Sequence, residues 1–149
     1  NVKIWGPPAP LWMPVATTKQ MFQNKMVFNS DKAQAFLGAK IVLNNLHYGE
    51  IWGLNVRTFE AAGIGAFQMV DWRPGLEQLF NDGEEIISFK NMDELPEKIN
   101  YWLNNPEKRE EIALAGKARA YREHTYELRL KLIFATLDQQ AQGFPVPAI

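Results

Sequence analysis

Three short apolar runs alternate with helix-like segments in the middle of the chain, and this alternation constrains the fold most. The runs cover residues 40–44, 66–70 and 85–89, and helical patterns lie between them at 56–62 and 76–80. Strands that alternate with helices predict a parallel sheet with helices on both of its faces. We therefore expect an α/β fold with a doubly wound parallel sheet.

Glycine-containing turns separate these segments. Gly63-Ile64-Gly65 is a very short link between the helix at 56–62 and the next strand, and Asn81-Asp82-Gly83 precedes the third apolar run. Glycine supplies the left-handed conformation that commonly ends a helix and permits close packing. Gly63 and Gly65 are thus explained by folding alone.

The N-terminal part is patterned more weakly than the middle. Val2 to Trp5 predicts a short strand, which Gly6-Pro7-Pro8 stops. Ser30 or Asp31 is expected to cap a helix that runs to Gly38.

From residue 92 onward the chain is helical in character. Helices are expected over 93–103 and 106–122, and a last helix follows Thr125 as its N-cap, with Tyr126 as a packing residue. We expect a single domain over residues 1–142 and an extended tail over 143–149.

Composition excludes several classes of function. Net charge is -1, with 16 Lys+Arg against 17 Asp+Glu, so nothing favours nucleic acid as a partner. The chain has no cysteine and 2 histidines, so we expect no metal and a cytoplasmic location. No apolar run approaches the roughly 20 residues of a membrane-spanning helix. Because the chain begins with Asn rather than Met, we expect it to be a processed or excised piece.

The loop that follows residues 40–44 leads into a candidate ligand site. Ligands of open α/β sheets lie beyond the carboxyl ends of the strands. Asn55 is a preferred N-cap residue there, and the first helical turn offers free N–H groups that suit a phosphate. Arg57 opposes the helix dipole in that turn, so it favours a nearby anion, and Glu60 follows three residues later. The alternative is an exposed Arg57–Glu60 ion pair worth about 0.3–0.5 kcal/mol.

Two further loops offer polar groups near the same strand ends. His47 is a possible phosphate ligand or polar donor, although a loop histidine is more often a surface or capping residue. The segment 71–75, with sequence DWRPG, either contacts a base or sugar or simply turns into the next helix.

The residues around this site carry a family resemblance. The segment Asn55-x-Arg57-x-Phe59-Glu60-Ala-Ala-Gly63-x-Gly65 with Asp71 resembles the signature of the CgeB-type, spore-maturation-protein-like glycosyltransferases, which are relatives of glycosyltransferase group 1. The similarity covers about residues 40 to 134 and is weaker over 2–6. It continues in these motifs: Leu79-Phe80, Gly83-x-Glu85-Ile86, Asp93-Glu94-Leu95, Ile99-x-Tyr101-x-Leu103, Arg109-x-x-Ile112-Ala113-x-x-Gly116 and His124-Thr125-Tyr126.

This resemblance implies the donor-binding half of a GT-B enzyme, which has two Rossmann-like domains around one cleft. By that analogy Glu60 receives the donor ribose hydroxyls, and Asn55 to Arg57 lie near the diphosphate of a nucleoside-diphosphate sugar. It implies a bacterial-type, hexosyltransferase-like enzyme that needs no metal or other cofactor. The acceptor site belongs to a missing N-terminal domain, so the isolated chain is expected to be inactive or nearly so.

One departure from the family pattern leaves the reaction open. Retaining group 1 enzymes have two glutamates separated by seven residues, but Trp52 lies eight positions before Glu60 and Glu50 is out of register. The catalytic residues and the stereochemical outcome therefore stay undetermined. The alternative to an enzyme domain is a non-catalytic nucleotide-binding or protein-interaction module with the same fold.

Overall fold

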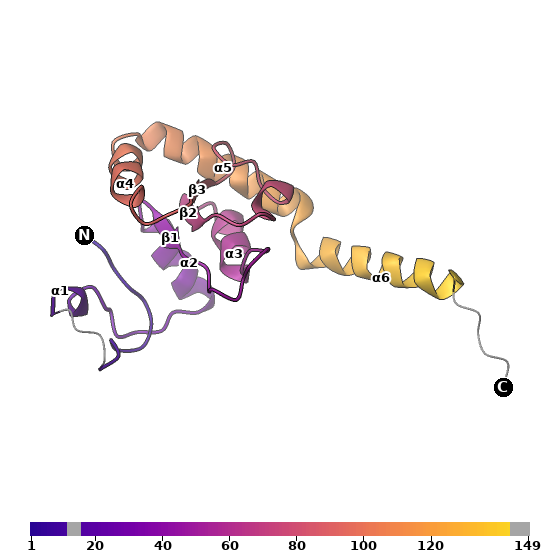
Figure 1. The fold of residues 1–149 in the computed structure, drawn as a ribbon, viewed down its shortest axis with the longest axis horizontal. Helices are drawn as coiled ribbons and strands as arrows, with labels where there is room; N and C mark the ends of the chain where they lie inside the picture. The colour runs from indigo at the N-terminus through magenta and orange to yellow at the C-terminus, as the bar shows by residue number, and fades with distance from the viewer. Residues whose placement is uncertain (12–15, 144–149) are drawn as a thin grey trace. The chain divides into compact units, whose positions relative to one another are not determined.

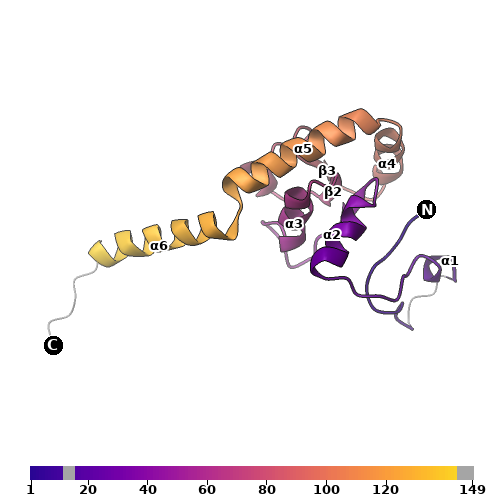
Figure 2. The same cartoon turned by 180° about the vertical axis from the view of Figure 1, so that it is seen from behind.

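The computed structural model describes residues 1–11 and 16–143 (Figures 1 and 2). The chain groups into two compact units, Asn1–Ala39 and Lys40–Ile149, and each is described by itself. The expected single domain over residues 1–142 stays a prediction.

Over residues 1–11 and 16–39, the first unit contains two helices, α1 (Ala16–Lys19) and α2 (Asn29–Leu37). The predicted strand over residues 2–5 is wrong, because Ile4 makes only an isolated parallel bridge with Phe22. The predicted caps of α2 are also wrong: Phe28 occupies the N-cap position and no side chain caps the helix. Backbone amides of residues 31 and 32 instead bond to the carbonyl of Phe28.

The second unit contains a parallel sheet of three strands in the order β1 (Val42–Asn44), β2 (Gln68–Asp71) and β3 (Ile87–Phe89). Val42 pairs with Gln68 and Met69 pairs with Ile87, so the carboxyl ends of all three strands lie at one edge. This confirms the predicted α/β class and its parallel sheet.

Helices connect and follow the strands as the alternating pattern predicts. Helix α3 (Val56–Ile64) joins β1 to β2, and a short 3-10 turn, η1 (Leu76–Gln78), replaces the helix predicted at 76–80. Helices α4 (Leu95–Leu103), α5 (Pro106–Glu123) and α6 (Tyr126–Gly143) form the predicted helical C-terminus. Helix α4 begins two residues later than predicted.

Both faces of the sheet are covered, because neighbouring residues of each strand point to opposite sides. Val70 belongs to a core with Ala62, Phe80 and Ala120, which come from α3, the η1 region and α5. Met69 belongs to a second core on the other face, whose remaining buried members are Phe67, Ile87, Phe89, Leu95 and Ile112. Helix α5 contributes to both cores, so it ties the two layers together.

The Gly63-Ile64-Gly65 link differs in detail from the prediction. Gly63 lies inside α3, and Gly65 alone takes the left-handed conformation, with φ 86°. Its backbone amide bonds to the carbonyls of Ala61 and Ala62, as expected of a helix C-terminal glycine. The extended-tail prediction falls on residues 144–149, which lie outside the described residues, and Gly143 ends α6.

Gly116 lets α5 approach the backbone just before β3 closely. It is buried, and a Cβ atom there would lie 2.3 Å from the carbonyl oxygen of Glu85, which is backbone and cannot move aside freely. We expect Gly116→Ala to lower the free energy of unfolding by about 1–3 kcal/mol through overpacking. Urea denaturation measures this loss.

Gly63 supplies the matched control. It also lies within a helix, but a Cβ atom there would meet nothing within 4 Å. Gly63→Ala should therefore raise stability by about 0.5–1 kcal/mol through helix propensity. Equal effects of the two substitutions would show that the Gly116 contact does not limit packing.

Candidate functional site

The predicted site lies where β1 ends and α3 begins, at the carboxyl edge of the sheet (Figure 1). Asn55 is the N-cap of α3, as the sequence predicts, with φ -78° and ψ 164°. Its Oδ1 accepts hydrogen bonds from the backbone N–H of Thr58 and from the Thr58 hydroxyl, both at 3.2 Å. Asn55 therefore has a structural role at the start of this helix.

Asn44, the last residue of β1, is fully buried and connects the strand to the cap. Its Nδ2 donates to Asn55 Oδ1 at 3.1 Å and to Thr58 Oγ1 at 2.9 Å. Asn55 Nδ2 donates back to Asn44 Oδ1 at 3.2 Å. The two side-chain amides thus pair reciprocally, which satisfies an otherwise costly buried amide.

The same Asn44 oxygen also positions Arg57. Nη1 of Arg57 donates to Asn44 Oδ1 at 3.2 Å, although the arginine residue itself is exposed. Because an amide oxygen is neutral, this hydrogen bond orients the guanidinium and leaves its charge in place. A cation held beside a helix N-terminus attracts an anion. The sequence analysis did not assign Asn44 to the site. A polar residue at the end of an apolar run, where a strand terminates, is the signal that could have indicated it.

Glu60 lies three residues beyond Arg57 in α3, and its residue is partly buried. The intervening Phe59 points into the core, where its ring lies 5.7 Å from that of Phe80. Glu60 and Arg57 are thus presented by the same two helical turns at the carboxyl edge. Their role toward a ligand stays a prediction.

His47 lies in an exposed tight turn after β1. Its Nδ1 accepts the backbone N–H of Gly49 at 3.0 Å, and its own backbone N–H donates to Glu50 Oε2 at 2.9 Å. The turn is closed by a bond from Glu50 N to His47 O, also 2.9 Å. Since Nδ1 accepts, the neutral ring carries its proton on Nε2. These contacts agree with a capping histidine and leave the predicted phosphate contact untested.

The sequence model of the glycosyl transferase-like family matches residues 1–135. The chain belongs to this family. No curated protein and no solved structure matches it significantly. The match supports a glycosyltransferase domain of the group 1 type, and it does not distinguish the narrower CgeB-type group.

In this family member, Glu50 closes the turn that begins at His47. That carboxylate accepts the backbone N–H of His47, as described above, and the Glu50 carbonyl accepts Arg73 Nε at 2.5 Å. Trp52 occupies the position eight residues before Glu60 and is 60% exposed. Glu50 is therefore engaged locally, and a tryptophan stands where retaining group 1 enzymes have their first carboxylate.

Arg73 holds the loop after β1 against the loop after β2. Besides Glu50 O, its guanidinium contacts the Trp72 carbonyl at 2.7 Å and Asp71 Oδ1 at 3.0 Å. The carbonyl of Trp52 accepts the backbone N–H of Gly75 at 2.9 Å, and a Cβ atom on Gly75 would lie 2.7 Å from it. The 71–75 segment therefore has a clear structural role as a turn that anchors its neighbour.

The loop after β3 completes this edge. Glu94 Oε1 accepts the backbone N–H groups of Lys90 and of Asn91, and Lys98 Nζ lies 3.2 Å from Glu94 Oε2. The two backbone N–H groups, followed by Lys98, lower the pKa of Glu94 below its ordinary value. The Lys90 ammonium lies 5.1 Å from the centre of the Trp72 ring, which joins this loop to the one after β2.

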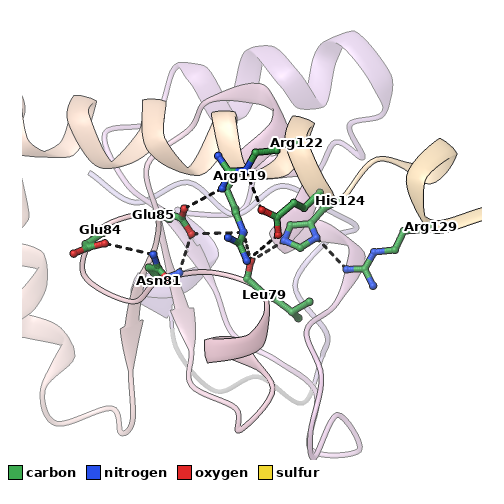
Figure 3. A network of polar contacts seen from close by, with 9 residues as sticks. Leu79, Asn81, Glu84, Glu85, Arg119, Arg122, His124 and Arg129 are labelled. Atoms are coloured by element: carbon green, nitrogen blue, oxygen red, sulfur yellow. Dashed lines mark hydrogen bonds and ion pairs between the residues drawn. The ribbon is translucent and has the colours of Figure 1, made fainter. Parts of the chain in front are cut away.

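A separate polar network surrounds His124 at the end of α5 (Figure 3). His124 Nε2 lies 2.7 Å from the Leu79 carbonyl, and Arg129 donates to Nδ1 at 3.1 Å. The imidazole also packs 5.0 Å from the ring of Phe80 and 5.3 Å from that of Phe59. These contacts join the start of α6 to α3 and to the η1 region, so His124 has a structural role.

Charged side chains of α5 extend this network. Arg119 Nη2 lies 2.9 Å from Glu123 Oε2, and Arg122 Nε donates to Glu123 Oε1 at 2.9 Å. The hydrogen bond from Arg122 is the main cause that lowers the pKa of Glu123. Both arginines also lie 3.9 Å from carboxylate oxygens of Glu85.

The predictions for Thr125 and Tyr126 have different outcomes. Thr125 Oγ1 accepts the backbone N–H of Leu128 at 3.3 Å, which confirms the cap. Tyr126 is 77% exposed, so its predicted packing role is wrong. The first turn of α6 is held through Arg129 and His124 instead.

Neither a metal cluster nor a membrane helix occurs in the part of the chain that the structure describes. Over residues 1–11 and 16–143, no group of three or more His, Cys, Asp or Glu side chains could hold a metal ion. Within the same ranges, no helix has the length and apolarity needed to cross a membrane.

Substitution of Arg73 tests whether its contacts hold the loops after β1 and β2 together. Its side chain is 17% exposed and makes hydrogen bonds to two carbonyls. We expect Arg73→Met to lower the opening free energy of the 47–53 loop by about 1.5–3 kcal/mol, the usual range for hydrogen bonds to a charged group. Amide hydrogen exchange at Glu50 and Gly75 measures this opening and should become faster.

Arg122→Met is the matched control, since that side chain is 57% exposed and distant from the loop in sequence. It should leave exchange at Glu50 and Gly75 unchanged. Unchanged exchange in Arg73→Met would contradict the anchoring role.

Proposed function

We propose that this chain is the nucleotide-sugar-binding half of a GT-B glycosyltransferase, with the diphosphate of the donor at the start of α3. The observation that carries the proposal is the Arg57 guanidinium, held by a neutral oxygen beside the N-terminal turn of this helix. A helix N-terminus and a guanidinium both suit a diphosphate, because each presents N–H donors and positive charge. The family match supports a sugar-transfer reaction.

Glu60 completes the proposed donor site. Its carboxylate would accept hydrogen bonds from the two ribose hydroxyls, while Arg57 and the backbone N–H groups stabilise the diphosphate leaving group. Asn55 would shape this segment as the cap of α3, and the Nε2–H of His47 would add a donor to a phosphate oxygen. We propose no metal or other cofactor, since fixed cationic groups would neutralise the charge that develops on the leaving group.

The acceptor site and a catalytic base would come from a preceding domain of the complete enzyme. The nucleoside-diphosphate sugar would then be the ligand of this half, and we propose the CgeB-type glycosyltransferases as the narrower group, because the motifs of this chain resemble theirs. Transfer would require both halves.

A non-catalytic nucleotide-binding module is the second candidate, and Trp52 is the observation that favours it. An indole stands where the first carboxylate of retaining group 1 enzymes is found, and the nearby Glu50 carboxylate is engaged in its own turn. Both candidates bind a nucleoside diphosphate. Sugar transfer by the chain joined to its upstream half separates them: transfer supports the enzyme, and binding without transfer supports the module.

Calorimetry with UDP, GDP and TDP tests the donor site itself. We expect Arg57→Ala and Glu60→Ala each to weaken binding of the preferred nucleotide by about 10- to 100-fold, because each removes charge-assisted hydrogen bonds. Arg122→Ala, an exposed arginine of the α5 network, is the control and should bind as the unchanged chain does. Unchanged affinity in both site variants would exclude this location.

A further inference from the structure

We infer that Asn44 is a positioning residue, which holds the Arg57 guanidinium in place for the diphosphate without neutralising it. The inference rests on the proposed function and adds a residue to it. Asn44 is fully buried, so it would act on a ligand through Arg57 rather than by touching the ligand.

The geometry gives the two ends of the Asn44 amide different tasks. Its Nδ2 donates to Asn55 Oδ1 and Thr58 Oγ1, which fixes the amide against the first turn of α3. Its Oδ1 accepts from Asn55 Nδ2 and from Arg57 Nη1. Since both donors and the acceptor are engaged, the orientation with the oxygen toward Arg57 satisfies every polar group of the amide.

The chemical identity of the acceptor is what makes the arrangement suited to a diphosphate. A carboxylate at this position would pair with the guanidinium and compensate its charge, so less of that charge would act on the ligand. An aliphatic side chain would leave the long arginine side chain without a fixed partner, and binding would then cost additional side-chain ordering. An amide avoids both effects, because it orients Arg57 and stays neutral.

Arg57 also needs a partner for an intramolecular reason. A cation in the first turn of a helix is opposed by the positive end of the helix dipole. The oxygen of Asn44 lies 3.2 Å from Nη1 and offsets part of this repulsion without removing the charge. A diphosphate would remove the remaining repulsion, so its binding is expected to stabilise the first turn of α3.

A double-mutant cycle tests the inference by calorimetry with the nucleoside diphosphate that binds the unchanged chain most tightly. Asn44→Leu should weaken binding about tenfold in the unchanged background, as expected for loss of a hydrogen bond to a charged group. In an Arg57→Met background the same substitution should change affinity by less than about twofold, because the effect is transmitted through Arg57. The corresponding nucleoside, which has no phosphate, should bind Asn44→Leu and the unchanged chain alike.

Asn44→Asp sharpens the test, because it keeps the shape of the side chain and adds a negative charge, while it also removes the two bonds that Nδ2 donates. It should weaken diphosphate binding more than Asn44→Leu does, and the excess should shrink in the Arg57→Met background, where only direct repulsion between the carboxylate and the diphosphate is left. If Asn44→Leu does not fold, Asn44→Ser takes its place in the same cycle. Gly116→Ala is the control for stability: it should lower the melting temperature and leave the affinity within about twofold, since its contact with Glu85 O is remote from the site.

The possible outcomes separate the inference from the function on which it rests. Equal losses with and without Arg57, or equal losses for the nucleoside and the diphosphate, would show that Asn44 is only structural and would overturn the inference alone. Failure of the unchanged chain to bind any of the three nucleoside diphosphates would overturn the proposed function, and the inference with it.

Discussion

The start of α3 depends on one buried polar contact, the reciprocal pair of side-chain amides between Asn44 and Asn55. A buried amide is costly unless its donors and acceptor are all matched, and here the partners come from the strand end, the helix cap and the first helical turn. The hydrogen bonds of the Asn44 side-chain amide therefore fix where α3 begins relative to the carboxyl end of β1. Arg57 and Glu60 of the proposed donor site take their positions from that helix, whereas His47 is held by its own turn.

A second set of contacts links the three loops at this edge of the sheet. Arg73 bonds to the carbonyl of Glu50, and Trp52 O accepts from Gly75, so the loops after β1 and β2 hold each other. Lys90 lies over Trp72 and brings in the loop after β3. The site thus combines fixed loops with an exposed cationic group, and a preorganised cation loses little entropy on binding an anion.

The sequence predicted the sheet and its connections well because their signals are local. Buried strands are apolar runs, and helix ends carry Asn55, Gly65 and Thr125, whose side chains or lack of one act on nearby backbone groups. The misses have a different cause. The predicted strand at residues 2–5 needs a pairing partner that local sequence cannot supply, and Ile4 has only an isolated bridge. The segment 76–80 has Leu76 and Phe80 packed into the core, as its helical pattern predicts, but its regular helix is limited to the 3-10 turn Leu76–Gln78. Likewise Asn44 pairs with residues 11 and 14 positions away, so no periodicity could assign it a role.

The central claim is that a diphosphate binds at the first turn of α3, and an NMR titration of the uniformly ¹⁵N-labelled chain with a nucleoside diphosphate tests it most directly. The account predicts the largest shifts at the backbone amides of Val56 and Arg57 and at the Arg57 guanidinium, with smaller shifts at the Asn44 side-chain amide. Shifts confined to the opposite edge of the sheet, around Asn81 to Glu85, or no shifts at saturating ligand, would contradict it.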